Sequence, residues 1–205
     1  MDKATLPSHT TATAPTATVG SVAVGMHGID KRFGAVRANR HVNLNVATAT
    51  IHGIVGENGA GKSTLMSVLY GMYQADAGRI AINGAAATIH NADDAIALGI
   101  GMVHQHFMLV DTLSVLDNIM LGAEPHWLLS RADKATQGQL RDLMQRTGLH
   151  LDLDSLVRDL AVGDRQRLEI IKALHRGANI LILDEPTAVL TPQEMAQLFE
   201  VLRGL

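Results

Sequence analysis

The stretch Gly56-Glu57-Asn58-Gly59-Ala60-Gly61-Lys62-Ser63-Thr64 decides how the rest of this chain is interpreted. It matches the phosphate-binding loop pattern, in which a glycine and four variable residues precede Gly-Lys-Ser. Glycines suit such a loop because its backbone curls around a phosphate group, and a Cβ atom would block the approach. We expect Lys62 to reach the outer phosphates and the Ser63 hydroxyl to bind Mg²⁺. The stretch therefore predicts a site for a nucleoside triphosphate.

The residues on both sides of the loop favour the same interpretation. Residues 51–55, Ile-His-Gly-Ile-Val, are mostly apolar and β-branched, which predicts a short buried strand. Residues 65–69, Leu-Met-Ser-Val-Leu, predict the first turns of a helix, whose free N–H groups and positive dipole end suit an anion. An ordinary glycine-rich turn followed by a chance lysine is the alternative. The strand, loop and helix in this order argue against it.

The composition limits the class of protein. The chain has 205 residues, of which 47% are apolar, enough for one domain with a sizeable core. Its net charge of −3 gives no sign of a basic surface, so we expect no nucleic acid partner. Without cysteine it can form neither disulfides nor thiolate metal sites. No apolar run approaches the roughly 20 residues that span a bilayer, so we expect membrane association only through a partner.

Local patterns along the chain predict an α/β fold. Residues 1–20 are rich in Thr, Ala and Pro, which predicts a disordered tail; a targeting segment is the alternative, but the long apolar core or the arginines of such segments are missing. Between residues 107 and 160 the pattern becomes helical, which predicts a helical insertion. Strands are predicted at residues 22–26, 42–46, 79–82, 100–104 and 179–183, with a hairpin turn at Asn83-Gly84. Helices are predicted at residues 92–98, from Ser114 to Gly122, up to Gly148, and from Pro192 onward with Met195, Leu198, Phe199 and Leu202 facing inward.

Polar residues that follow two of these strands are candidates for chemistry. Asp184 and Glu185 come directly after residues 179–183, and ligands of open α/β sheets bind at such carboxyl ends of strands. In an enzyme with a phosphate-binding loop the aspartate holds Mg²⁺ and the glutamate polarises the attacking water. A plain acidic turn is the alternative. His104 and His106 share one face of a strand, but without a third ligand we interpret them as ordinary polar side chains rather than a metal pair.

From Val22 to Leu205 the chain resembles the ATP-binding subunits of ABC transporters. Besides the loop and the acidic pair, residues 160–167, Leu-Ala-Val-Gly-Asp-Arg-Gln-Arg, stand where that family has its Leu-Ser-Gly-Gly-Gln signature. Gln105 matches the family's Q-loop glutamine, and Phe33 matches the aromatic residue that stacks on adenine. An ordinary core phenylalanine is the alternative for Phe33.

The resemblance implies an α/β P-loop NTPase domain of the ABC type over residues 21–205, with a helical subdomain over about 107–165. It implies ATP and Mg²⁺ as cofactors, Glu185 and Gln105 as catalytic residues, and Ser63, Gln105 and Asp184 around the metal. The residues that it assigns to the nucleotide are Phe33, Gly56, Glu57, Asn58, Gly59, Ala60, Gly61, Lys62, Ser63, Thr64, Ala161 and Gly163. Of these, Ala161 and Gly163 belong to the signature and would contact the nucleotide of a second cassette.

Residues 101–110, 162–166 and 184–192 are similar to those of importers of simple sugars and nucleosides. That similarity implies a second cassette in the same or a fused chain, membrane permease subunits, an extracytoplasmic substrate-binding protein, and a peripheral position on the cytoplasmic face of the membrane. A soluble ABC ATPase that does not transport is an alternative, but the basic face or coiled coil expected of one is missing. An ATP-binding fragment without turnover is another.

The sequence departs from the family pattern at three places. Ala161 replaces the signature serine, and the loss of one hydrogen bond to a charged phosphate costs about 1.5–3 kcal/mol. Thr191 stands where the family's D-loop usually has aspartate, although threonine is frequent in the importer subgroup. The sequence ends at Leu205, before the position of the switch histidine, so we expect a domain incomplete at its C-terminus, the N-terminal part of a longer protein.

Overall fold

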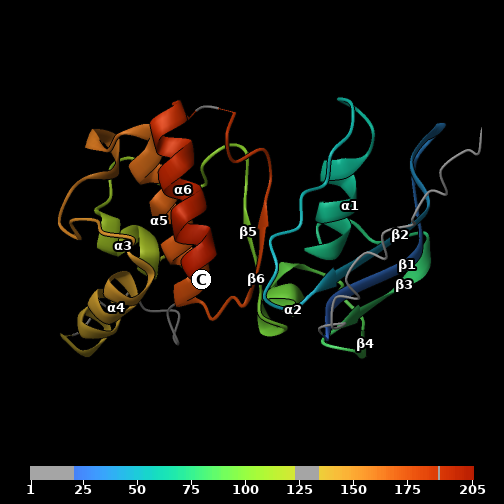
Figure 1. Ribbon diagram of the computed structural model, residues 1–205, viewed down its shortest axis with the longest axis horizontal. Helices are drawn as coiled ribbons and strands as arrows, with labels where there is room; N and C mark the ends of the chain where they lie inside the picture. Colours follow the sequence, from blue (N-terminus) through green and yellow to red (C-terminus); the bar gives the residue numbers. More distant parts are fainter. Residues whose placement is uncertain (1–20, 123–133, 189) are drawn as a thin grey trace, which may run out of the picture.

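The computed structural model describes residues 21–122, 134–188 and 190–205, so the predicted tail at residues 1–20 lies outside the described residues. Four antiparallel strands form one sheet in the order β2-β1-β3-β4 (Figure 1). The predicted turn at Asn83-Gly84 is confirmed, because both residues have positive φ, 51° and 80°, as a two-residue hairpin requires. The strands are β1 (Val22–Phe33), β2 (Val36–Ala47), β3 (Ala77–Ile82) and β4 (Ala85–Ala87).

A second sheet contains two parallel strands that are far apart in the sequence. These are β5 (Ile100–Val103) and β6 (Ile180–Leu183). Ile100 pairs with Ile180 and Val103 with Leu183, so the two strands are in register along their whole length. The residues that follow each strand therefore leave the sheet at the same edge, which places the segment after Val103 beside the segment after Leu183.

Several helices begin and end at residues that the sequence marks. Ser114 caps α3 by accepting a hydrogen bond from Asp117 N at 3.0 Å, as predicted. Thr191 caps α6 in a capping box with Glu194. Gly99 and Gly148, with φ of 78° and 70°, lie just after α2 and α4. The helices are α1 (Lys62–Leu69), α2 (Ala92–Ala97), α3 (Val115–Met120), α4 (Lys134–Thr147), the 3₁₀ helix η1 (Val157–Asp159), α5 (Val162–His175) and α6 (Pro192–Gly204).

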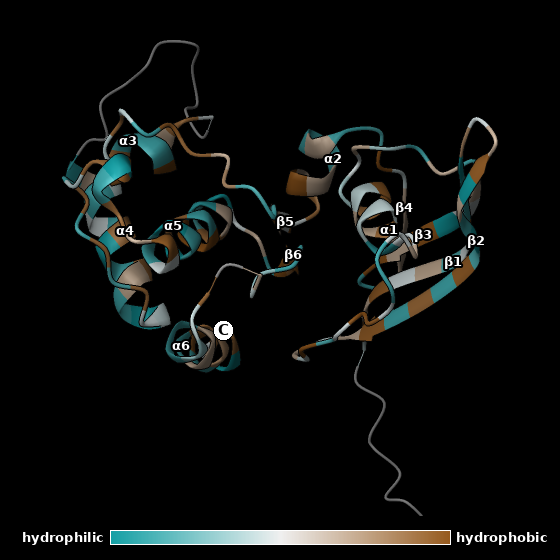
Figure 2. Ribbon diagram, turned by 90° about the horizontal axis from the view of Figure 1, so that it is seen from above, coloured by the Kyte–Doolittle hydropathy of each residue, from teal (hydrophilic) through white to brown (hydrophobic). Residues whose placement is uncertain are grey.

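Two clusters of buried apolar side chains meet at β5 and β6. One lies between the antiparallel sheet and α1 and includes Met26, Leu65 and Ile100. The other surrounds α5 and includes Leu140 and Ile170. In Figures 1 and 2, α3, α4, α5 and α6 lie on one side of β5 and β6, and the antiparallel sheet with α1 lies on the other. The helices within residues 107–165 thus share a core with α5 and α6, while the subdomain boundary itself stays a prediction.

Two sequence predictions are wrong. Residues 51–55 are irregular rather than a buried strand, and the side chains of Ile51 and Val55 are 57% and 95% exposed. A strand requires a hydrogen-bonded neighbour, and β5 and β6 pair with each other, so no described strand covers this segment. On α6, Leu198 is buried as predicted, but Phe199 is 41% exposed. None of the helices formed by the described residues combines the length and the apolar character needed to cross a bilayer.

Candidate nucleotide-binding site

The glycine loop lies directly against β2. Gly61, the residue before α1, has φ 88°, and a Cβ atom there would lie 2.2 Å from the carbonyl oxygen of Ala38. The side-chain nitrogen of Asn39 donates a hydrogen bond to Gly61 O at 3.0 Å. Gly61 is therefore required twice, for its left-handed conformation and for its close approach to the strand. Asn39 was missed by the sequence analysis, because no local pattern links a residue of β2 to the loop.

Groups that can bind an anion gather where the loop meets α1. No side chain caps the start of α1, and its first turn contains no acidic residue. The N–H groups there have no intrahelical partners, so a phosphate group fits this helix end. Lys62 Nζ donates to the carbonyl oxygens of Gly56 and Glu57 at 2.7 and 2.9 Å, and Ala60 N donates to Glu57 O. The lysine therefore spans the loop with its ammonium group at the loop's own backbone.

The loop and the end of β6 meet although 121 positions separate them in the sequence. Ser63 Oγ lies 3.0 Å from Asp184 Oδ1, to which it donates a hydrogen bond. Hydroxyl and carboxylate oxygens are ligands that Mg²⁺ accepts in nucleotide sites. The structure thus brings together two of the three residues predicted around the metal, and their donor set fits Mg²⁺.

The segments that follow β5 and β6 meet through a second polar contact. Gln105 Nε2 donates to Glu185 Oε2 at 3.0 Å, as the register of the two strands allows. Glu185 has φ 48°, a left-handed conformation that costs a non-glycine residue about 1–2 kcal/mol. Two hydrogen bonds hold the turn that contains it: Ala188 N donates to Glu185 O, and the buried Gln166 side chain donates to Pro186 O at 2.8 Å. Such strain is frequent at functional sites.

Among the described residues, Phe33 makes its ring contacts with Tyr73 and Lys31 and not with the glycine loop, Asp184 or Glu185. It ends β1 with 42% of its surface exposed. Its ring meets Tyr73 edge to face, with centroids 5.0 Å apart, and Lys31 Nζ lies 5.3 Å from its centroid. Tyr73 was another residue missed from the sequence, where nothing marks it as a neighbour of Phe33. The stacking of Phe33 on adenine stays a prediction.

Ala161 and Gly163 lie apart from the loop, at the start of α5, which Figure 1 shows on the other side of β5 and β6 from α1. Ala161 is exposed at the N-cap position and makes no capping hydrogen bond. Gly163 faces α6, where a Cβ atom would lie 2.7 Å from Glu194 Oε1. The Thr191 backbone N–H, the Thr191 hydroxyl and the Gly163 N–H together hold the pKa of Glu194 below its usual range.

His104 and His106 belong to no larger group of metal-ligating side chains among the described residues. The described part of the chain contains no group of three His, Asp or Glu side chains suited to a metal ion. His104 instead meets Tyr70 edge to face, with ring centroids 6.1 Å apart.

Comparison with known proteins places this geometry in a family. A family model described as ABC transporter matches residues 39–188. The guanosine import ATP-binding protein NupO of Bacillus subtilis is 49% identical over 183 residues, which cover 89% of this chain and 36% of that protein. The ribose import ATP-binding protein RbsA 1 of Burkholderia thailandensis is 48% identical with the same coverage. The chain thus spans about a third of the length of these relatives.

Solved structures share the fold. CbiO1 of Clostridium perfringens, part of an ABC transporter complex, is similar with a TM-score of 0.76 and 25% identity over 89% of this chain and 73% of that one. An ATP-binding cassette of an ABC transporter in its ADP conformation has a TM-score of 0.80 with 23% identity, over 89% and 76%. The chain therefore belongs to the ABC transporter family of ATP-binding cassettes.

Proposed function

We propose that this chain binds ATP with Mg²⁺ and contributes to its hydrolysis in an importer of simple sugars or nucleosides. The observation that carries the proposal is the 3.0 Å contact between Ser63 and Asp184, which joins the phosphate loop to the acidic end of β6. Two relatives are named as import proteins for guanosine and for ribose, and these names support a sugar or nucleoside as the transported substrate. When bound, Mg²⁺ neutralises charge on the outer phosphate oxygens.

Each side chain has a role that its position supports. The loop amides, the start of α1 and Lys62 bind the phosphates, which replace the carbonyl oxygens that the ammonium group now contacts. Ser63, Asp184 and Gln105 lie around the metal. Glu185 accepts one hydrogen bond from Gln105 through Oε2, and its Oε1 accepts none among the described residues, which leaves it free to orient and polarise a water molecule.

The start of α5 serves a second cassette in this proposal. Ala161 is exposed at the N-cap position of α5, which lies on the other side of β5 and β6 from α1. Two cassettes that face each other head to tail would therefore each complete the other's site. Permease subunits, an extracytoplasmic substrate-binding protein reached through them, and a peripheral place on the cytoplasmic face of the membrane belong to the same proposal.

Calorimetric titration with ATP and Mg²⁺ tests the site. We expect wild-type chain to bind, and Lys62→Ala to lose most of the affinity, because an ammonium–phosphate contact is a strong charged hydrogen bond. Lys134→Ala is the matched control, since Lys134 is exposed at the start of α4. Unchanged affinity of the Lys62 variant would show that ATP binds elsewhere or that the loop is not the site.

A further inference from the structure

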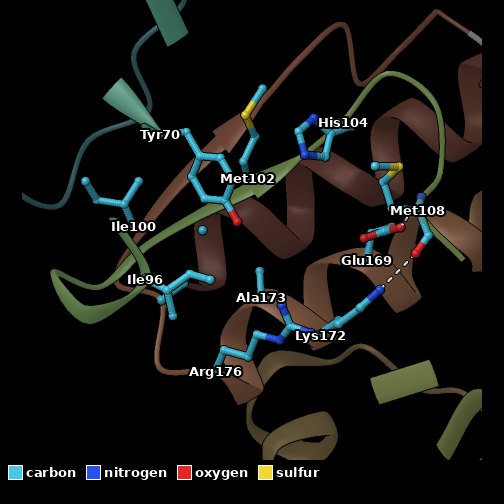
Figure 3. Close-up of a pocket in the computed structure, with 12 residues that line it drawn as sticks. Tyr70, Ile96, Ile100, Met102, His104, Met108, Glu169, Lys172, Ala173 and Arg176 are labelled. Atoms are coloured by element: carbon cyan, nitrogen blue, oxygen red, sulfur yellow. Dashed lines mark hydrogen bonds between the residues drawn. The ribbon is translucent and has the colours of Figure 1, made fainter. Parts of the chain in front are cut away.

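A second concave site lies between β5, α5 and the ends of α1 and α2. Its cavity has a volume of about 170 Å³. Ile96, Ile100, Met102 and Ala173 provide apolar walls, and Tyr70, Lys172 and Arg176 provide polar groups (Figure 3). Neither the glycine loop nor Ser63, Asp184, Glu185 or Gln105 lines it. It is therefore separate from the candidate nucleotide site.

Two hydrogen-bond donors at this cavity have no partner. Arg176 Nε is buried and makes no hydrogen bond, while the same guanidinium group donates through Nη2 to Leu121 O. The Tyr70 hydroxyl makes no hydrogen bond to any described residue, and Figure 3 shows it directed toward the middle of the group. Burial raises the pKa of Tyr70, so its hydroxyl keeps its proton and remains a donor. The buried Arg176 Nε without an acceptor costs free energy, which a suitable ligand would recover, and the hydroxyl of the half-buried Tyr70 is available to the same ligand.

The charges around the cavity are not balanced. Lys172 is only 9% exposed, and neither it nor Arg176 forms an ion pair with a described carboxylate. Burial, helped by the nearby Arg176 charge, lowers the pKa of Lys172. Glu169 is the acid of the lining, and it accepts from Met108 N at 2.7 Å while Lys172 donates to Met108 O at 2.9 Å. Among the described lysine, arginine and acidic residues that line the cavity, two cations and one anion leave an excess of one positive charge.

We propose that this cavity binds a single carboxylate group carried on a short apolar stem, with Arg176, Lys172 and Tyr70 as its hydrogen-bond donors. A monoanion balances the one excess charge, and the apolar walls suit the stem. At about 30 Å³ for each small group, 170 Å³ accommodates roughly six non-hydrogen atoms. That is the size of butanoate or of the end of an acidic side chain. The carboxylate belongs either to a free small acid or to an aspartate or glutamate of a bound protein.

Titration followed by amide chemical shifts tests this site on the chain itself. Butanoate is the probe, and butanamide, its neutral counterpart, is measured with added sodium chloride to match the ionic strength. We expect saturable shifts centred on β5 and α5 with butanoate, and binding of butanamide at least about tenfold weaker because it lacks the charge. Capped glutamate, N-acetylated and amidated, distinguishes the two sources. Binding as tight as that of butanoate indicates a protein side chain, and loss of binding indicates a free acid.

Variants identify the donors. Tyr70→Phe removes only a hydroxyl and is expected to weaken butanoate binding by about tenfold. Tyr73→Phe is the matched control, because Tyr73 lies against Phe33 outside the cavity, and it should leave binding unchanged. Arg176→Gln should abolish binding; if that variant does not fold, Tyr70→Phe still decides. Equal binding of butanamide and butanoate, the absence of saturable shifts, or an unaffected Tyr70 variant would each overturn the proposal.

Discussion

Gly61 is required for its left-handed conformation and for its close approach to β2, and replacement by alanine tests both requirements. Gly59 and Gly61 both lie in the loop and both have left-handed φ, 82° and 88°. A Cβ atom on Gly59 would meet nothing within 4 Å, whereas on Gly61 it would lie 2.2 Å from Ala38 O and 2.8 Å from Asn39 Nδ2. Gly59→Ala is therefore a matched control that introduces the same conformational strain without the collision.

The expected magnitudes differ accordingly. The left-handed conformation costs an alanine about 1–2 kcal/mol, which is the whole expected effect of Gly59→Ala. Gly61→Ala adds overpacking against a strand backbone, about 1–3 kcal/mol, and disturbs the hydrogen bond from Asn39, about 1 kcal/mol. We expect Gly61→Ala to lower the free energy of unfolding by about 3 kcal/mol or more.

Urea unfolding of the three proteins, followed by far-ultraviolet circular dichroism, measures these differences. The slope against urea concentration should stay constant, so that the midpoints report stability alone. Equal destabilisation by the two substitutions would refute the reasoning, because it would mean that the loop does not rest on β2 in solution.

Three further outcomes are expected. In an assembled pair of cassettes, Glu185→Gln should retain bound ATP and lower phosphate release by about a hundredfold or more, because the amide keeps the shape but loses the charge of a general base; wild-type turnover would assign Glu185 a structural role. The chain alone should release little phosphate at any protein concentration, since Ala161 lies away from the chain's own loop; turnover that rises faster than linearly with concentration would contradict this. Glu194→Gln should destabilise the chain at neutral pH, and the gap to wild type should close in acid. The reason is that the pKa of Glu194 is lowered by the Thr191 and Gly163 donors, so its stabilisation is present above its unfolded pKa and disappears as the pH falls through its folded pKa. Thermal unfolding across a pH series measures that gap, and a constant gap would count against the contact.

The elements predicted correctly from the sequence are those with local signals. The Asn83-Gly84 turn and the Ser114 cap are short-range chemistry within four residues, and both are present. The position of the acidic pair after β6 was predicted from the aliphatic strand before it, and the structure brings Asp184 to Ser63, while the roles of the pair stay predictions.

The predictions that were wrong concern residues whose structure depends on distant neighbours, which no local pattern specifies. Residues 51–55 have the composition of a buried strand, but a strand exists only with a paired partner, and none of the described strands lies beside them. Phe199 has helical spacing with Met195 and Leu202, yet of the predicted inward residues only Leu198 is deeply buried, because the width of an apolar stripe depends on what covers it. Asn39 and Tyr70 matter through contacts with distant segments, so the sequence gives no signal for either.

Hydrogen bonds between α5 and Met108 restrict the movement of Gln105. Both backbone groups of Met108 are fixed, one to Glu169 and the other to Lys172, and only two residues separate Met108 from Gln105. A three-residue step can extend by no more than about 10–11 Å, which sets the greatest possible distance between Gln105 and Met108. A displacement of α5 that carries Met108 beyond this reach would draw Gln105 away from Glu185. A short stretch of backbone therefore links α5, through Met108 and Gln105, to the carboxylate of Glu185.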